Sequence, residues 1–229
     1  MMWNGKARTI SINQQAYIKI MVEKFGLTST KKTTTPMEQN AQFSIQQCLA
    51  ILNQMVCMKE IPYPEAIGLI LWLTVVSRPN TAFAVGILLQ FIQNPGPAHW
   101  DGIKRIISYL ATTKNLWLTF GGGKHMQLQG YCNAEWASLP HRHSISGFLF
   151  HYGQGAISWS SRKQNIIVLS STEVEYVAEM HAEKEALWLK TFANKVTGIM
   201  TKPLTIMYDN QGAMVLAKDN EFHSPSISI

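Results

Sequence analysis

The spacing of apolar residues changes near residue 120, and this change divides the chain into two predicted parts. In the first part, apolar residues recur every three or four positions, which is typical of helices. Helices are predicted at residues 13–25, 62–76, 81–93 and 98–110, and short strands at 8–12 and 116–120. The first part is therefore expected to be mainly helical.

Beyond residue 125 the pattern becomes that of strands, interrupted by one long helix. Strands are predicted at 126–132, 145–152, 156–160 and 204–208, and helices at 172–195 and 210–217. The apolar run Ile166–Leu169 adds strand character just before the long helix. This order predicts a mixed α/β sheet domain. The expected organisation is a helical part at 1–120, a glycine-containing linker at 121–125 and the sheet domain at 126–229.

The start of the long helix carries acidic residues. Ser170 to Thr172 are favourable N-cap residues, and Glu173 and Glu175 follow them in the first turn. One interpretation is that these carboxylates complement the positive end of the helix dipole. Another is that Glu175 meets Asp209, at the end of the later strand, to hold divalent cations that promote phosphodiester cleavage. Charge alone leaves both interpretations open.

The net charge of +6 is unevenly distributed. Residues 1–124 hold 12 Lys and Arg against 5 Asp and Glu, whereas residues 125–229 hold 8 against 9. A basic first part and an acid-bearing second part fit a protein that holds a polyanion and binds cations. The same distribution also fits ordinary solubility.

Cysteine usage and hydropathy predict an intracellular protein without a membrane segment. The three cysteines form no C-x-x-C pair, which favours a reducing compartment over a disulfide framework. The apolar run Ala66–Val76 is too short to span a bilayer, and the first residues lack the apolar stretch of a signal peptide.

Three other sequence patterns do not indicate a functional site. The Gly121–Lys124 run lacks the first glycine and the Ser or Thr of a phosphate-binding loop. His141 and His143 have no second ligand pair at zinc spacing. The serines between Ser158 and Ser171 are in no nucleophile motif and have no evident base beside them.

Ordered short motifs run along nearly the whole chain. They include Thr35-Pro36-Met37, Arg78-Pro79, His99-Trp100, Gly130-Tyr131-Cys132-Asn133-Ala134-Glu135-Trp136, Ser158-Trp159-Ser160-Ser161-Arg162-Lys163-Gln164, Ser170-Ser171-Thr172-Glu173-Val174-Glu175-Tyr176 and Tyr208-Asp209-Asn210-Gln211. In this order they resemble the C-terminal part of the Pol polyprotein of copia-type LTR retrotransposons. The resemblance implies the thumb- and connection-like end of a reverse transcriptase at 1–120 and an RNase H-like domain, lacking its last elements, at 126–229. No Tyr-Val-Asp-Asp motif is present, so polymerisation is not expected.

The resemblance also implies a site for cutting the RNA strand of an RNA–DNA hybrid with two Mg²⁺ or Mn²⁺ ions held by four acids. Glu175 matches the acid on the helix and Asp209 the acid on the later strand. The first acid falls at Asn133, a neutral amide, and the fourth has no counterpart. Glu135 is a candidate substitute because residues 133 and 135 of a strand share a face, but they are about 6.6 Å apart. We therefore expect a compromised two-ion site and weak or absent cleavage.

Binding of nucleic acid is expected to be retained although cleavage is weak or absent. Lys104, Arg105, Arg162 and Lys163 are the candidate contacts to the phosphates of a hybrid, and ordinary solvated cations are the alternative. The predicted partners are an RNA–DNA hybrid or other nucleic acid and the rest of a Pol polyprotein. The expected location is the cytoplasm or nucleus, or the virus-like particle of an active element. A non-catalytic nucleic-acid-binding or scaffold remnant is the alternative function, and an unstable relic is a third hypothesis.

Overall fold

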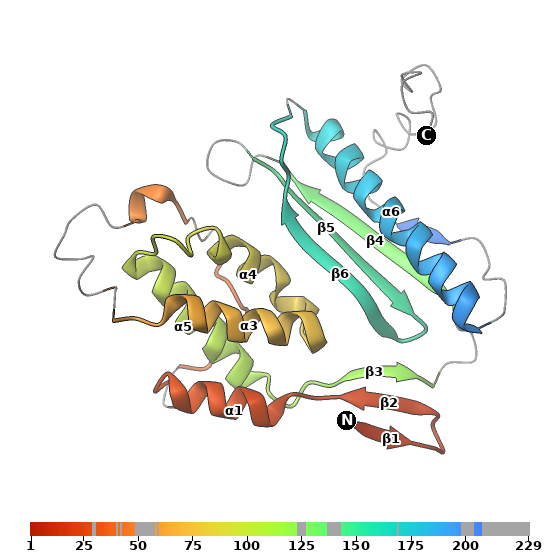
Figure 1. The fold of residues 1–229 in the computed structure, drawn as a ribbon, viewed down its shortest axis with the longest axis horizontal. Helices are drawn as coiled ribbons and strands as arrows, with labels where there is room; N and C mark the ends of the chain where they lie inside the picture. Colours follow the sequence, from red (N-terminus) through yellow and green to blue (C-terminus); the bar gives the residue numbers. More distant parts are fainter. Residues whose placement is uncertain are drawn as a thin grey trace. The chain divides into compact units, whose positions relative to one another are not determined.

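The structure is a computed structural model, and it describes only part of the chain. The described residues are 1–28, 31–39, 41, 43–48, 58, 60–122, 127–136, 143–168, 170–197 and 204–207. The chain divides into two units, Met1–Gly122 and Gly123–Ile229. Helices and sheets both contribute (Figure 1), so the predicted mixed α/β class is confirmed.

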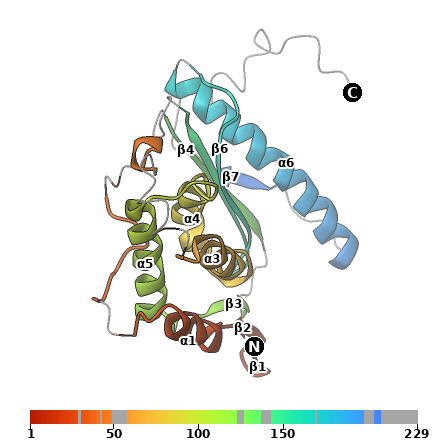
Figure 2. The ribbon, with the colours of Figure 1, turned by 60° about the vertical axis from the view of Figure 1, so that its left-hand side comes forward.

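In its described residues, the first unit combines helices with a small antiparallel sheet (Figures 1 and 2). The helices are α1 (Gln15–Lys24), α3 (Tyr63–Ser77), α4 (Ala82–Leu89) and α5 (Pro97–Thr112), with 3-10 turns η1 (Ile45–Gln47) and η2 (Pro79–Thr81). The strands β1 (Met2–Asn4), β2 (Thr9–Ile12) and β3 (Leu118–Gly121) pair in the order β1-β2-β3. The first of these strands was not predicted, because its exposed residues show no apolar alternation.

The core of the first unit is formed where the apolar faces of the helices meet. On α5, the side chains of Ile103, Ile106, Ile107 and Leu110 recur at helical spacing, and all four are fully buried. They pack with buried residues of α1, α3 and α4 in one cluster. The apolar periodicity of the sequence therefore identified the buried face of this helix correctly.

The helix predicted to reach residue 93 is shorter in the structure. It ends at Leu89, because the backbone N–H groups of Gln90, Phe91 and Ile92 donate to carbonyls three residues earlier and tighten the chain into turns. This turn carries Phe91 onto the ring of His99, with ring centroids 4.0 Å apart. The apolar pattern continues through the turn because Phe91 is still buried.

His99 is a fully buried histidine at the start of α5. Its Nδ1 accepts a hydrogen bond of 2.8 Å from the backbone N–H of Gly96, so this nitrogen carries no proton. Burial lowers the pKa of His99, and the nearby backbone of Ser44 acts in the opposite direction. The neutral ring therefore fits the folded chain better than the charged ring.

This histidine makes the stability of the first unit pH-dependent. Its pKa is lower in the folded state, so the unfolded state binds more protons and stability rises with pH. The contribution is fully present above about pH 6.5 and is lost as the pH falls through the folded-state value. Urea denaturation at several pH values across this range should show the free energy of unfolding decreasing as the pH falls. The His99→Gln variant should show a smaller decrease. The exposed His181→Gln is the control and should keep the wild-type pH dependence.

In its described residues, the second unit is a four-stranded sheet with one helix across a face (Figure 1). Its strands are β4 (Leu128–Glu135), β5 (Ile145–Tyr152), β6 (Gly155–Lys163) and β7 (Thr205–Met207), in the order β6-β5-β4-β7, and its helix is α6 (Ser171–Thr197). Strand β4 is antiparallel to β5 and parallel to β7. Ala182, Ala186 and Leu189 of α6 pack on residues of β4 and β5.

Some predicted boundaries in this unit need correction. Strands β4 and β6 extend beyond the predicted ends at residues 132 and 160. The described part of the apolar run before α6 is not a strand: Ile166 and Ile167 lie in an exposed connection, and Val168 is buried. The chain turns at Gln164, whose side chain donates to Ser146 Oγ and to the carbonyl of Val174 and ties the connection to the helix. The helix predicted at 210–217 lies outside the described residues.

No helix in the described residues is both long enough and apolar enough to cross a bilayer.

Candidate active site

Strand β4 carries the position of the first predicted acid. Burial alternates along the strand: Leu128, Gly130 and Cys132 are buried, whereas Asn133 and Glu135 are exposed. Because Leu128 and Cys132 pack against α6, this alternation places the side chains of Asn133 and Glu135 on the other face of the sheet. The two residues therefore share a face, as predicted.

Helix α6 supplies the predicted helix acid. The hydroxyl of Ser170 accepts a hydrogen bond of 3.2 Å from the backbone N–H of Glu173, which confirms the predicted N-terminal cap. Glu175 is partly buried and lies at helical spacing with the buried Glu179 and Ala182, on the side of α6 that faces the sheet. The structure thus places Glu175 toward the sheet, but not on the face that carries Asn133.

Strand β7 leads toward the third predicted acid. It pairs in parallel with β4, and the described register joins Gln129 to Thr205, Gly130 to Ile206 and Tyr131 to Met207. Asp209 lies outside the described residues, so the meeting of Glu175 and Asp209 stays a prediction. The described residues contain no group of three or more His, Cys, Asp or Glu side chains that could hold a metal ion.

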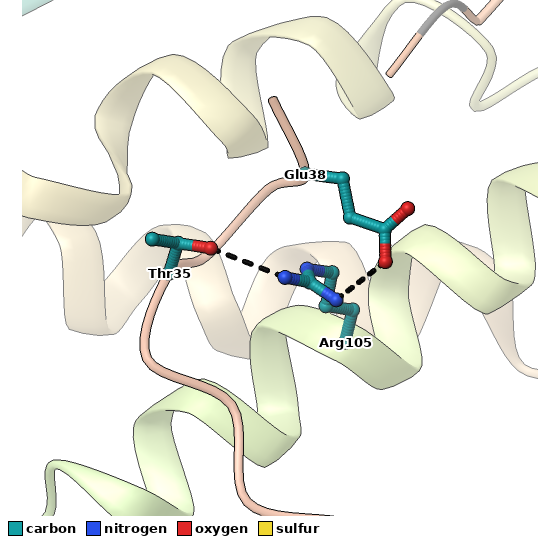
Figure 3. Close-up of polar contacts among 3 residues, drawn as sticks. All are labelled: Thr35, Glu38 and Arg105. Carbon is teal, nitrogen blue, oxygen red and sulfur yellow. Dashed lines mark hydrogen bonds and ion pairs between the residues drawn. The ribbon is translucent and has the colours of Figure 1, made fainter. Parts of the chain in front are cut away.

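The candidate basic residues differ in their surroundings. In the first unit, Lys104 Nζ lies 2.6 Å from the carboxylate of Asp101. Arg105 donates to Glu38 at 2.7 Å and to Thr35 at 3.1 Å (Figure 3). In the second unit, Arg162 and Lys163 are exposed at the end of β6. The two cations of the first unit are therefore partly neutralised by neighbouring carboxylates.

A pocket that the sequence did not indicate lies beside α6. It has a volume of about 270 Å³, and Arg162 of β6 and Lys184 of α6 both contribute to its lining. The helical spacing of His181, Lys184 and Trp188 was a readable signal for a shared helix side. Which strands this side faces could not be read from the sequence.

Comparison with known proteins identifies the class of this chain. It is 35% identical over 219 residues to the retrovirus-related Pol polyprotein from transposon TNT 1-94 of Nicotiana tabacum, covering 95% of the chain and 16% of that protein. It is 30% identical over 216 residues to the corresponding polyprotein from transposon RE1 of Arabidopsis thaliana, covering 94% of the chain and 14% of that protein. The chain is therefore retrotransposon-derived, and it spans about one seventh of the length of these curated relatives.

A shorter relative places the chain in a family. It is 44% identical over 142 residues to the secreted RxLR effector protein 161 of Plasmopara viticola, covering 62% of the chain and 100% of that protein. The chain belongs to one family with this protein, and the transposon Pol polyproteins are its homologues. The predicted Pol polyprotein origin is confirmed, whereas the names do not specify a reverse transcriptase or RNase H region. No family model matches the chain, and no solved structure matches it.

Proposed function

We propose that this chain is an RNase H-like protein, descended from a retrotransposon nuclease that cuts the RNA strand of RNA–DNA hybrids, and that its own cleavage is weak or absent. The observation that carries the proposal is the order of the sheet, β6-β5-β4-β7, with α6 between β6 and the parallel strand β7. The expected acids belong to an opening strand, a long helix and the strand after it, and β4, α6 and β7 occur in that order.

The register of the two parallel strands supports the same proposal. Tyr131 of β4 pairs with Met207 of β7. Asn133 follows Tyr131 by two residues, and Asp209 follows Met207 by two residues. Asn133 and Asp209, the first and third acid positions, are thus each two residues beyond the same strand pair. Two residues that form one site at the ends of parallel strands must be at matching positions in this way.

A pair of divalent ions does not fit the donors that the described residues provide. Asn133 offers a neutral amide, and Glu135 is on the exposed face of β4 while Glu175 is on the sheet-facing side of α6. Mg²⁺ and Mn²⁺ need several oxygen ligands, most of them anionic, close together. The described side chains therefore support binding of a hybrid better than its cleavage.

A hybrid-cleavage assay with Mg²⁺ or Mn²⁺ tests this function. We expect no turnover above background for the wild-type chain and a measurable gain for Asn133→Asp, because the substitution adds an anionic ligand where the family has one. Asn133→Gln is the matched control, since it keeps an amide and should give no gain. Robust wild-type turnover that disappears in Asp209→Asn would show that the site is competent and that the proposed impairment is wrong.

Binding without cleavage is the second candidate function, and the neutral side chain of Asn133 favours it. If Asn133→Asp binds a hybrid but gains no activity, the chain is a nucleic-acid-binding or scaffold remnant. The affinity for the hybrid should fall steeply with added salt, because Arg162 and Lys163 would release counterions from the phosphates. An affinity that does not change with salt would argue against phosphate contacts altogether.

A further inference from the structure

The pocket beside α6 lies between this helix and strands β5 and β6. Its polar lining consists of Ser146, Ser160, Arg162, His181, Lys184 and Glu185. The side chains come from three elements that the fold holds together, because α6 packs across β4 and β5 and β5 pairs along its whole length with β6. The pocket is therefore lined by elements that pair and pack directly with one another.

The two cationic side chains in this pocket, Arg162 and Lys184, outnumber its one carboxylate, Glu185. Within the described residues, neither Arg162 nor Lys184 forms an ion pair, whereas Lys104 of the first unit is paired with Asp101. The carboxylate in the lining, Glu185, accepts a hydrogen bond of 2.6 Å from the hydroxyl of Ser158. A guanidinium, an ammonium and serine hydroxyls together match the acceptor oxygens of a phosphate group.

An exposed aromatic pair continues from the pocket along the helix. Trp188 is one helical turn beyond Lys184, about 6 Å along the axis, and Phe192 is one turn further. Their rings lie parallel, with centroids 5.4 Å apart and an interplanar angle of 8°. Trp188 is 58% exposed and Phe192 is 54% exposed. Two large parallel rings at the surface offer flat apolar faces on which a nucleic-acid base can stack.

We propose that this pocket and the Trp188–Phe192 pair together form a binding surface for single-stranded nucleic acid. Arg162 and Lys184 hold a backbone phosphate, and the aromatic pair stacks on bases of the same strand. Cations beside aromatic rings are the combination that such strands require, because phosphates alternate with flat bases. The surface does not depend on the hybrid-cleaving ancestry, since Asn133 and Glu135 are on the opposite face of the sheet.

Fluorescence anisotropy with a labelled oligothymidylate tests the proposal on the full chain. Trp188→Ala is expected to weaken binding by about tenfold or more, because each stacked base contributes strongly to affinity. Trp188→Phe should retain most of the affinity, since it keeps a stacking surface. Arg162→Gln should weaken binding and make the slope of log affinity against log salt shallower by about 0.7, the value of one lost phosphate contact on a single strand.

Two neighbouring residues provide matched controls. Leu187 is 66% exposed on α6 but points away from Trp188 around the helix, so Leu187→Ala should bind like the wild type. Lys190 follows Trp188 by two residues on α6, which places it about 200° away around the helix, so Lys190→Gln should leave the salt slope unchanged. Circular dichroism verifies that each variant is folded.

Three outcomes would overturn the proposal. The first is the absence of oligothymidylate binding by the wild-type chain. The second is binding that all the variants retain equally. The third is a wild-type dimer in sedimentation that Trp188→Ala dissociates without any change in oligothymidylate affinity, which would assign the aromatic pair to contact with a second copy of the chain. None of these results bears on hybrid cleavage, which is measured separately through Asn133→Asp.

Discussion

Replacing Phe150 with Ala is expected to destabilise the second unit by about 3–5 kcal/mol. The ring is fully buried beneath α6, in the cluster that contains Leu128, Ala182 and Leu189. Across the strand pair it lies against Gly130, where an added Cβ would come within 2.3 Å of Phe150 Cε1. Because residue 130 has no side chain to move inward, the cavity left by the ring would stay largely unfilled.

Urea denaturation of the full chain would measure this loss, with hydrogen exchange of peptides from β4 and α6 to assign it to the second unit. Phe148→Ala is the matched control, because Phe148 is on the same strand and the same face but is only half-buried. Phe148→Ala should lower the free energy of unfolding clearly less than Phe150→Ala does. If the two substitutions lower the free energy of unfolding equally, the contact between Gly130 and Phe150 does not stabilise the core more than the packing of Phe148 does.

The sequence predicted the elements of the second unit better than their contacts. The predicted bounds of β5, residues 145–152, match the structure because apolar residues are dense along the strand and Gly153 provides a turn. The pairing of Gly130 with Phe150 depends on the register between two strands, which is fixed by the whole sheet. The apolar run before α6 misled the strand prediction because exposed Ile166 and Ile167 have the same sequence signal as buried residues.

For the candidate site, too, the sequence predicted local geometry better than the contacts between distant elements. The two-residue period of a strand correctly gave Asn133 and Glu135 a common face. Which face α6 covers is decided by packing between distant elements, and no local pattern revealed it. The pairing of Lys104 with Asp101 could be read from their three-residue spacing, whereas Glu38 is 67 residues from Arg105 in sequence.

Arg78 in the first unit is a buried cation that caps a helix. It is 3% exposed, and its Nη2 donates at 2.5 Å to the carbonyl oxygen of Thr113, the C-terminal cap of α5. Its Nη1 donates to the hydroxyl of the same threonine at 3.3 Å. Burial lowers the pKa of Arg78, with the charge of Tyr109 acting in the opposite direction. A positive group at the C-terminus of a helix is favourable, and here it also satisfies a carbonyl that has no partner within the helix.

Arg78→Ala is therefore expected to destabilise the first unit by about 2–4 kcal/mol, because a charged hydrogen bond is lost and a cavity remains. Arg78→Lys should cost less but still be measurable, since one ammonium cannot reproduce both donors of the planar guanidinium. Arg105→Ala is the comparison at a more exposed ion pair: Arg105 is 27% exposed and its partner Glu38 is 69% exposed, so the loss should stay within about 1 kcal/mol. Urea denaturation with hydrogen exchange of α5 peptides would compare the three variants. If Arg78→Ala costs no more than Arg105→Ala, the guanidinium at the end of α5 does not stabilise the helix, and burial of the charge offsets its hydrogen bonds.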